Sequence, residues 1–133
     1  MSGENSLRVR DAMTTSLRTI EAMATVADAI RTMREAQVSS LVVKRRDDAD
    51  EFALLVIADI AREVIAKNRS AERVNVYEVM SKPVLTVPAD MQVKYAVRLL
   101  DRFGLSRALV VDERREPVGI VTLRDMVLSY AQG

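Results

Sequence analysis

The sequence has 133 residues and contains neither cysteine nor histidine. Without cysteine the chain cannot form disulfides, cysteine zinc sites, iron–sulfur clusters or thiol nucleophiles. Without histidine it cannot build a Ser-His-Asp triad, a histidine-ligated metal site or an imidazole acid–base catalyst. These absences favour a binding protein over an enzyme, and we predict no catalytic and no metal-ligating residues.

Aromatic residues are scarce, at 4% with no tryptophan, so the core must consist of aliphatic side chains and methionine. The 20 basic and 19 acidic residues nearly cancel, which argues against a general nucleic-acid binder. No apolar run approaches the roughly 20 residues needed to span a bilayer, and the polar N-terminus lacks the layout of a signal peptide. We therefore expect a cytoplasmic protein that binds neither membranes nor nucleic acid.

The sequence repeats itself at an offset of 67 residues. Among the 36 aligned pairs of Val9–Lys44 and Val76–Val111, nine are identical, whereas unrelated segments would match at roughly two or three positions. The identical pairs are Val9/Val76, Met13/Met80, Thr19/Thr86, Ala22/Ala89, Val26/Val93, Ala29/Ala96, Arg31/Arg98, Ser39/Ser106 and Val43/Val110. After a slip of one residue, Asp59 aligns with Asp125. The chain therefore contains two similar units.

Both repeats predict the same series of elements. An apolar stripe at i, i+3, i+4 and i+7 predicts a helix that begins near Val26 or Val93, with Thr25 or Asp90 as its N-cap. Two apolar runs flank a polar turn and predict a β-hairpin, made of residues 41–43 and 52–57 or of 108–111 and 118–122. A closing helix is predicted over residues 58–67 or 123–131. With a short strand before the first helix, each unit reads β-α-β-β-α.

The predicted fold class is α+β, with two pseudo-symmetric β-α-β-β-α repeats packed through their sheets into one module. About 60 residues without aromatic side chains would bury too little surface to be stable alone. We expect a flexible tail over residues 1–7, the first repeat over 8–66, a polar linker over 67–73 and the second repeat over 74–131.

Three segments of the chain resemble the signature of the CBS (cystathionine-β-synthase) domain. Gly119–Met126 resembles the closing motif Gly-h-h-Thr-x-x-Asp-h, where h is apolar. The opening motif is matched by Val9–Thr14 and Val76–Ser81, and the middle strand by Val38–Val43 and Leu105–Asp112. The resemblance covers about residues 8–130 and implies a tandem CBS pair, or Bateman module. The chain leaves no room for a further catalytic domain, so the free-standing kind is expected.

A CBS pair implies a regulatory module that is not an enzyme. The resemblance implies an adenosine-type ligand between the repeats, namely AMP, ADP, ATP or S-adenosylmethionine, and no other cofactor. It also implies a change of shape or dimer geometry that is passed to a regulated enzyme or transporter. The alternative is a non-catalytic dimerisation or scaffold module without a physiological nucleotide.

The resemblance implies a main ligand site at the closing motif of the second repeat. The carboxylate of Asp125 can accept both hydroxyls of a ribose, while Thr122 and an arginine can reach phosphate. An ordinary helix N-cap is the other reading of Asp125. Gly119 would let the backbone pass close to a neighbouring segment. Carried over from the family, the main site comprises Ser16, Arg18, Val38, Ser39, Arg107, Ile120, Thr122 and Asp125.

A second, weaker site is implied at the closing motif of the first repeat. Ala53 and Val56 stand there in place of the motif's glycine and threonine, so a hydroxyl that could meet phosphate is lost. This site comprises Lys82, Pro83, Leu85, Leu105, Ser106, Leu54 and Asp59.

Family dimers bury apolar helix faces, so a homodimer is expected. The candidate interface residues are Met33, Leu99, Leu100, Met126 and Leu128, some of which must belong to the core.

Overall fold

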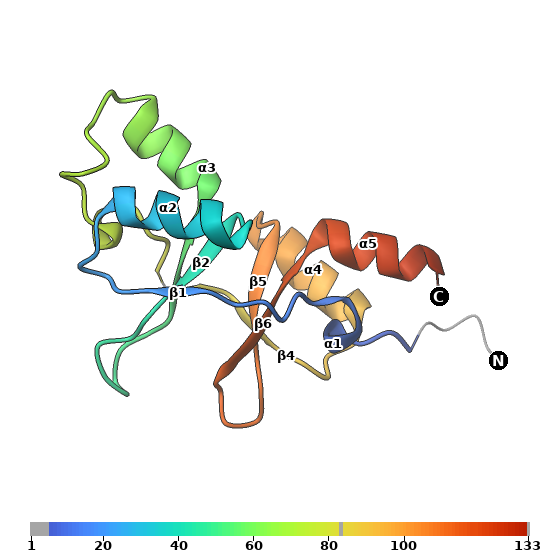
Figure 1. The fold of residues 1–133 in the computed structure, drawn as a ribbon. Helices are drawn as coiled ribbons and strands as arrows, with labels where there is room; N and C mark the ends of the chain where they lie inside the picture. Colours follow the sequence, from blue (N-terminus) through green and yellow to red (C-terminus); the bar gives the residue numbers. More distant parts are fainter. Residues whose placement is uncertain (1–5, 83, 133) are drawn as a thin grey trace. The chain divides into compact units, whose positions relative to one another are not determined.

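The computed structural model describes residues 6–82 and 84–132, in which short strands alternate with helices (Figure 1). The elements are α1 (Val9–Ala12), β1 (Thr19–Ile20), α2 (Val26–Ala36), β2 (Ser40–Val43), β3 (Ala53–Val56), α3 (Ile57–Ile60), a π-helix (Ala61–Ile65), a 3-10 helix (Val76–Glu78), β4 (Thr86–Pro88), α4 (Val93–Phe103), β5 (Arg107–Val111), β6 (Pro117–Thr122) and α5 (Leu123–Gln132). No helix within these residues is both long and apolar enough to cross a membrane.

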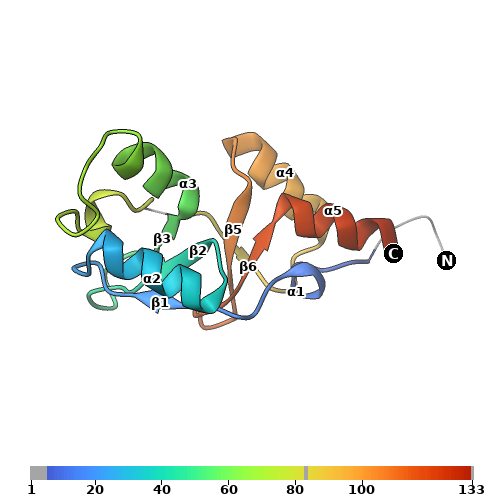
Figure 2. The same ribbon diagram turned by 45° about the horizontal axis from the view of Figure 1, so that its top comes forward.

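One compact unit is formed by the uninterrupted stretch Arg18–Val84, which we call the continuous unit. Its sheet has the order β1-β2-β3, with β1 parallel to β2 and β2 antiparallel to β3. The helix α2 contacts β2, as Figure 2 also shows. The buried core consists of Ile20, Val26, Ala29, Met33, Leu41, Val43, Ala53, Leu55, Ile60, Val64, Val74, Val76 and Val79.

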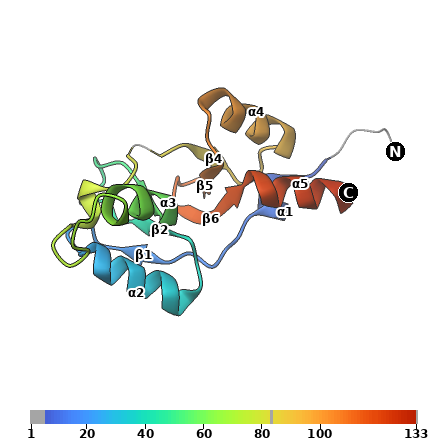
Figure 3. The same cartoon turned by 90° about the horizontal axis from the view of Figure 1, so that it is seen from above.

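The other compact unit combines the residues before Arg18 with those from Leu85 onward, and we call it the discontinuous unit. Its sheet β4-β5-β6 has the same pattern of one parallel and one antiparallel pair. The helix α1, near the start of the chain, contacts β6 and α5, which lie near the end of the chain (Figure 3). The core consists of Val9, Ala12, Val87, Val93, Ala96, Leu100, Ala108, Val110, Val121 and Met126.

The α+β class and the two repeats are confirmed, but repeats and compact units do not coincide. The opening motif of each sequence repeat packs in the unit that holds the other repeat's sheet. Val9 and Ala12 join the core of β4-β5-β6, whereas Val76 and Val79 join that of β1-β2-β3. The expected linker 67–73 lies inside the continuous unit, where the carbonyl of Ala71 accepts the N–H of Ala27 at 2.9 Å.

The expected N-terminal tail falls mostly outside the described residues, since 1–5 are not among them. Leu7, which belongs to the same expected tail, packs against the core of the discontinuous unit. Its carbonyl accepts the N–H of Val93 at 2.9 Å.

The helix ends follow local chemistry. Thr25 caps α2 as predicted, because its side chain accepts the N–H of Asp28 at 3.0 Å. The prediction that Asp90 caps the matching helix is wrong: Gln92 is the N-cap of α4 and its side chain makes no capping bond. Gly104 ends α4 with a left-handed φ of 64°, and Gln37 ends α2 with a φ of 56°.

The closing helices differ from one another. The predicted helix 123–131 is present as the regular helix α5. The predicted helix 58–67 begins one residue earlier, at Ile57, and after four residues changes to a π-helix that ends at Ile65. Single π-turns of this kind are rare and often lie at functional sites.

Three of the candidate interface residues prove to be core residues. Met33, Leu100 and Met126 are at most 4% exposed and fill the cores of their own units. Leu99 is partly buried against the core of the discontinuous unit, and Leu128 is 49% exposed.

Candidate functional site

Thr122 caps helix α5 in the discontinuous unit. It is the last residue of β6, and its Oγ1 accepts the backbone N–H of Asp125 at 3.0 Å. This bond between a residue and the N–H three positions later is that of an N-cap. The reading of Asp125 as the N-cap is therefore wrong, and its carboxylate lies in the first turn of the helix.

The carboxylate of Asp125 is accessible. Its side chain is 32% exposed, and its one contact among the described residues is an ion pair of 3.9 Å with Nη1 of Arg124, which is itself 80% exposed. A carboxylate with free lone pairs can accept two hydroxyl hydrogens without offering a competing donor. The N–H groups at the start of a helix also favour a negative charge nearby.

Arg107 stands opposite Thr122 in the sheet. The antiparallel register of β5 and β6 pairs these two residues, and directly paired residues place their side chains on the same face. The carbonyl of Ser106, one residue earlier, accepts the N–H of Leu123 at 2.9 Å. Hence Thr122, Arg107 and the N-terminus of α5 all lie at one end of this hairpin.

The segment after α1 runs along the edge of β6. Thr14 and Ile120 exchange two backbone hydrogen bonds of 2.8 and 3.0 Å. Gly119 permits this approach, as expected: a Cβ atom there would lie 2.6 Å from Sδ of Met13 and 2.9 Å from the carbonyl oxygen of Thr14. Because the pairing is antiparallel, the chain from Thr14 to the exposed Ser16 runs away from the Thr122 end of β6.

The equivalent place in the continuous unit is built differently. Val56 is the N-cap of α3 and makes no side-chain cap, since valine has no acceptor. The carboxylate of Asp59 is only 11% exposed and accepts a bond of 2.5 Å from Nη2 of Arg62. It also accepts a bond of 3.3 Å from the hydroxyl of Ser81. Asp59 is thus occupied by partners from its own unit, whereas Asp125 is open.

Ser81 contacts Asp59 in the candidate second site, and the sequence prediction did not include it. Its backbone pairs with Leu54 through bonds of 2.8 and 3.1 Å, which brings its hydroxyl to Asp59. The predicted neighbours were Lys82 and Pro83; Pro83 lies outside the described residues. The available signal was the opening motif, which ends in a hydroxyl residue in both repeats, Thr14 and Ser81.

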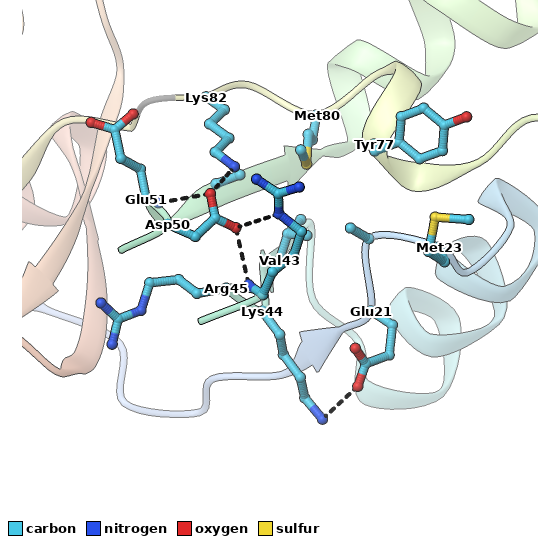
Figure 4. A pocket seen from close by; sticks show the side chains of 13 residues that line it. Glu21, Met23, Val43, Lys44, Arg45, Asp50, Glu51, Tyr77, Met80 and Lys82 are labelled. Atoms are coloured by element: carbon cyan, nitrogen blue, oxygen red, sulfur yellow. Dashed lines mark hydrogen bonds and ion pairs between the residues drawn. The ribbon is translucent and has the colours of Figure 1, made fainter. Parts of the chain in front are cut away.

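Lys82 lines a different cavity, of about 380 Å³, beside the β2–β3 hairpin (Figure 4). Its ammonium group pairs with the carboxylate of Asp50, whose side chain is only 8% exposed. That carboxylate also accepts the backbone N–H of Arg46 at 3.0 Å. The bond from Lys82, and after it the bond from Arg46, hold the pKa of Asp50 far below its usual range.

The other cations around this cavity are also engaged. Lys44 pairs with Glu21 at 3.2 Å, and the guanidinium of Arg45 lies 4.3 Å from the ring centre of Phe52. Arg46 remains exposed, and its Nε lies 3.5 Å from Oδ2 of Asp50. An anion entering this cavity would have to compete with acidic side chains already bound to its cations.

The remaining predicted residues are divided between the units. In the continuous unit, the carbonyl of Arg18 accepts the N–H of Val42 at 2.9 Å, and that of Ser39 accepts the N–H of Ile57 at 3.0 Å. Val38 packs partly against the core there. In the discontinuous unit, the carbonyl of Leu85 accepts the N–H of Leu109 at 2.9 Å, and the side chain of Leu105 is 41% exposed.

No group of three or more acidic side chains within residues 6–82 and 84–132 could hold a metal ion.

Comparison with protein families matches the CBS domain at residues 9–65 and 76–131. An uncharacterized protein of Methanopyrus kandleri is 32% identical over 95 residues, which are 71% of this chain and 48% of that protein. The chain spans about half or less of the length of the first curated relatives that it matches.

Two solved structures are similar over almost the whole chain. A hexameric CBS-CP12 protein from bloom-forming cyanobacteria has a TM-score of 0.88 at 31% identity, over 93% of this chain and 68% of that one. The cytosolic domain of the Mg²⁺ channel MgtE, in complex with ATP, has a TM-score of 0.72 at 25% identity, over 95% of this chain and 49% of that one.

Proposed function

Because the chain belongs to the CBS domain family and contains two copies of the domain, we propose that it is a regulatory module that binds an adenine nucleotide at Thr122 and Asp125. The observation that supports this most directly is the accessible carboxylate of Asp125 in the first turn of α5, beside a capping hydroxyl. In the proposed complex the carboxylate accepts the ribose hydroxyls. Thr122 and Arg107 lie on the phosphate side.

The similarity to an ATP-bound domain of a Mg²⁺ channel supports an adenine nucleotide as the ligand class. The same similarity supports a role in regulating an attached or separate partner such as a transporter. Ligand binding without turnover is the proposed activity.

We propose one strong site per chain. Binding a ribose at Asp59 would require displacing Arg62 from a carboxylate that is mostly buried, and leaving that carboxylate without its cation is costly. Asp125 has only the long ion pair of 3.9 Å with Arg124, a side chain that is 80% exposed. The alternative is a scaffold that binds no nucleotide. It is supported by the pairing of Asp59 with Arg62 and by the absence of a hydroxyl at Val56.

Isothermal titration calorimetry with AMP, ADP and ATP tests this proposal. We expect one nucleotide per chain for the wild type. Asp125→Asn, which keeps the shape but removes the charge, should weaken binding by about 10- to 100-fold, because hydrogen bonds to a charged group contribute about 1.5–3 kcal/mol.

Asp59→Asn is the matched control and should leave the affinity within about threefold of the wild type. Loss of binding in Asp59→Asn alone would contradict the assignment. If neither these three nucleotides nor S-adenosylmethionine produces heat or raises the melting temperature, the scaffold alternative is favoured.

A homodimer forms the second part of the proposal. Each unit carries large apolar side chains on the surface of its closing helix: Ile57 and Ile65 are 55% and 68% exposed, and Val127 and Tyr130 are 60% and 52% exposed. Such clusters of exposed apolar side chains are typical of association surfaces. Light scattering should give a dimer mass with and without nucleotide, and a monomer under both conditions would contradict it.

A further inference from the structure

The cavity of about 380 Å³ beside the β2–β3 hairpin has no part in the proposed nucleotide site (Figure 4). Every residue of its wall belongs to the continuous unit, whereas Thr122 and Asp125 belong to the discontinuous unit. Its volume lies within the range of about 300–1,000 Å³ that is typical of small-molecule pockets. The composition of its wall indicates which kind of small molecule it suits.

One side of this cavity consists of an aromatic ring and two methionines, namely Tyr77, Met80 and Met23 (Figure 4). Tyr77 and Met23 are 49% and 72% exposed, so neither side chain is used to fill the core. The buried residues Val43 and Ala53 continue the apolar wall. Methionine sulfur makes favourable contacts with aromatic rings, and aromatic rings also pair with one another. This side of the cavity therefore suits a flat aromatic group.

The other side of the cavity holds a cluster of three charged side chains. Lys82 forms an ion pair with the carboxylate of Asp50, and Nε of Arg46 lies 3.5 Å from the same carboxylate. That carboxylate also accepts the backbone N–H groups of Arg46 and Glu51, at 3.0 and 2.9 Å. Because two cations share one carboxylate, the cluster has a net charge of +1.

Arg46 is the cation of this cluster that a ligand can reach most easily. Its side chain is 79% exposed, compared with 27% for Lys82 and 8% for Asp50. A guanidinium can bind a carboxylate through two parallel N–H groups. An anion therefore has to compete only for the long contact of Arg46, and the buried pair of Asp50 with Lys82 can stay in place.

The acidic side chains of the wall limit the charge of the ligand. Glu21 and Glu51 line the cavity together with Asp50. Because like charges repel, each of these carboxylates disfavours a dianion such as a phosphate monoester more than it disfavours a monoanion. A single carboxylate group matches the single surplus positive charge of the cluster around Arg46.

We propose that this cavity is an additional binding site whose ligand is a small aromatic monocarboxylate. The aromatic ring of the ligand lies against Tyr77, Met23 and Met80, and its carboxylate binds the guanidinium of Arg46. The cavity shares no residue with the proposed nucleotide site at Thr122 and Asp125, so either proposal can fail without the other.

Three naphthalene probes of similar shape test this proposal: naphthalene-1-acetate, its neutral amide naphthalene-1-acetamide and the dianion 1-naphthyl phosphate. NMR titrations of the full chain with ¹³C-labelled methionine methyl groups locate the bound ring, because an aromatic ring shifts the signals of nearby methyl groups. The signals of Met23 and Met80 should move, whereas that of Met126, in the core of the discontinuous unit, should not. Naphthalene-1-acetate should bind about three- to tenfold more tightly than the amide, as expected for one exposed but bidentate ion pair. It should also bind more tightly than the phosphate.

Four variants separate the two halves of the site. Arg46→Gln should reduce the preference for the acetate over the amide to less than about twofold, because the charge that distinguishes the two probes is gone. Met23→Gln should weaken the binding of both probes and leave the preference unchanged. The controls are Arg34→Gln, outside the cavity wall, and Asp125→Asn, in the proposed nucleotide site, and both should bind the probes as the wild type does. Circular dichroism melts show that each variant folds.

Three results would overturn the proposal. The first is that the methyl signals of Met23 and Met80 stay in place with a large excess of naphthalene-1-acetate. The second is that Arg46→Gln keeps the full preference for the acetate over the amide. The third is that 1-naphthyl phosphate binds more tightly than naphthalene-1-acetate, because the ligand would then not be a monocarboxylate.

Discussion

Replacing Thr122 by valine should destabilise the protein through loss of a single hydrogen bond. Valine matches threonine in shape and β-branching, but it cannot accept the N–H of Asp125, now bonded at 3.0 Å. Removing an N-cap acceptor costs about 1 kcal/mol, within a range of about 0.5–2 kcal/mol. For a chain of this size that corresponds to a fall in melting temperature of about 4 °C.

The first repeat supplies the reciprocal experiment. Val56 occupies the N-cap position of α3 with an extended backbone, φ −114° and ψ 154°, and makes no cap. Val56→Thr should therefore raise the free energy of unfolding by up to about 1 kcal/mol. Thermal and urea denaturation of both variants, together with Thr122→Ser, measure the effect.

Thr122→Ser retains the hydroxyl and should remain within about 0.5 kcal/mol of the wild type. The reasoning is refuted if serine destabilises as much as valine does, because the threonine methyl group would then be the important part. It is equally refuted if Thr122→Val unfolds like the wild type.

Three further changes have defined expectations. Gly119→Ala should lower the free energy of unfolding by about 1–3 kcal/mol, because the new Cβ atom meets the backbone oxygen of Thr14 at 2.9 Å; normal stability in urea would contradict this. Gln37→Gly should raise the free energy of unfolding by about 0.5–1 kcal/mol, because glycine adopts the left-handed φ of 56° without strain. Gly104→Ala should lower the free energy of unfolding for the converse reason. Melting temperatures of both variants equal to that of the wild type would contradict this reasoning. The pKa of Asp50 is lowered on folding by the bond from Lys82. Its contribution to the free energy of unfolding is therefore complete above the unfolded pKa near 3.8 and is lost progressively as the pH falls towards the lower pKa of the folded state. Urea midpoints of Asp50→Asn should therefore lie below the wild type at pH 7 and approach it near pH 2, whereas Asp48→Asn, in the same loop, should match the wild type throughout.

The sequence predicts this fold well where local chemistry decides it. Two hairpins, two amphipathic helices and the caps at Thr25 and Gly104 follow from periodicity and residue type. The prediction of Asp90 as a helix cap is wrong because Gln92, not Asp90, is the residue aligned with Thr25. The helix α4 begins at the position that matches α2 in the repeat, although Asp90 is the better capping residue.

The assignment of segments to units could not be predicted from composition or periodicity. Whether Val9 packs against its own repeat or the other one depends on contacts more than 100 residues apart, such as the pairing of Thr14 with Ile120. The same holds for the contact between Ser81 and Asp59, which joins residues of different repeats.

The candidate site could be predicted in its chemistry and only partly in its contacts. The spacing of Thr122 and Asp125 indicates that they belong together, and the structure explains why: the first caps the turn that carries the second. The ion pair of Asp59 with Arg62 matches the i,i+3 spacing of two residues on the predicted closing helix, whereas the bond from Ser81 to Asp59 joins two repeats and had no such local signal.

The division of the chain into units also sets an order of events during synthesis. All residues of the continuous unit, Arg18–Val84, leave the ribosome before β5 and β6 emerge from it. Val9 and Ala12 emerge first of all, yet their buried partners Val121 and Met126 come last. At about 5–20 residues per second, these apolar side chains wait roughly 5–20 s for them.

Val9 and Ala12 are therefore expected to stay exposed longer than the core residues of the continuous unit, all of which have emerged once Val79 is outside the ribosome. Brief proteolysis of ribosome-bound chains that have exposed residues 1–90 should cut before Arg18, and protection of that segment would contradict this order. The beginning of the chain is thus the part most dependent on chaperones while the protein is being made.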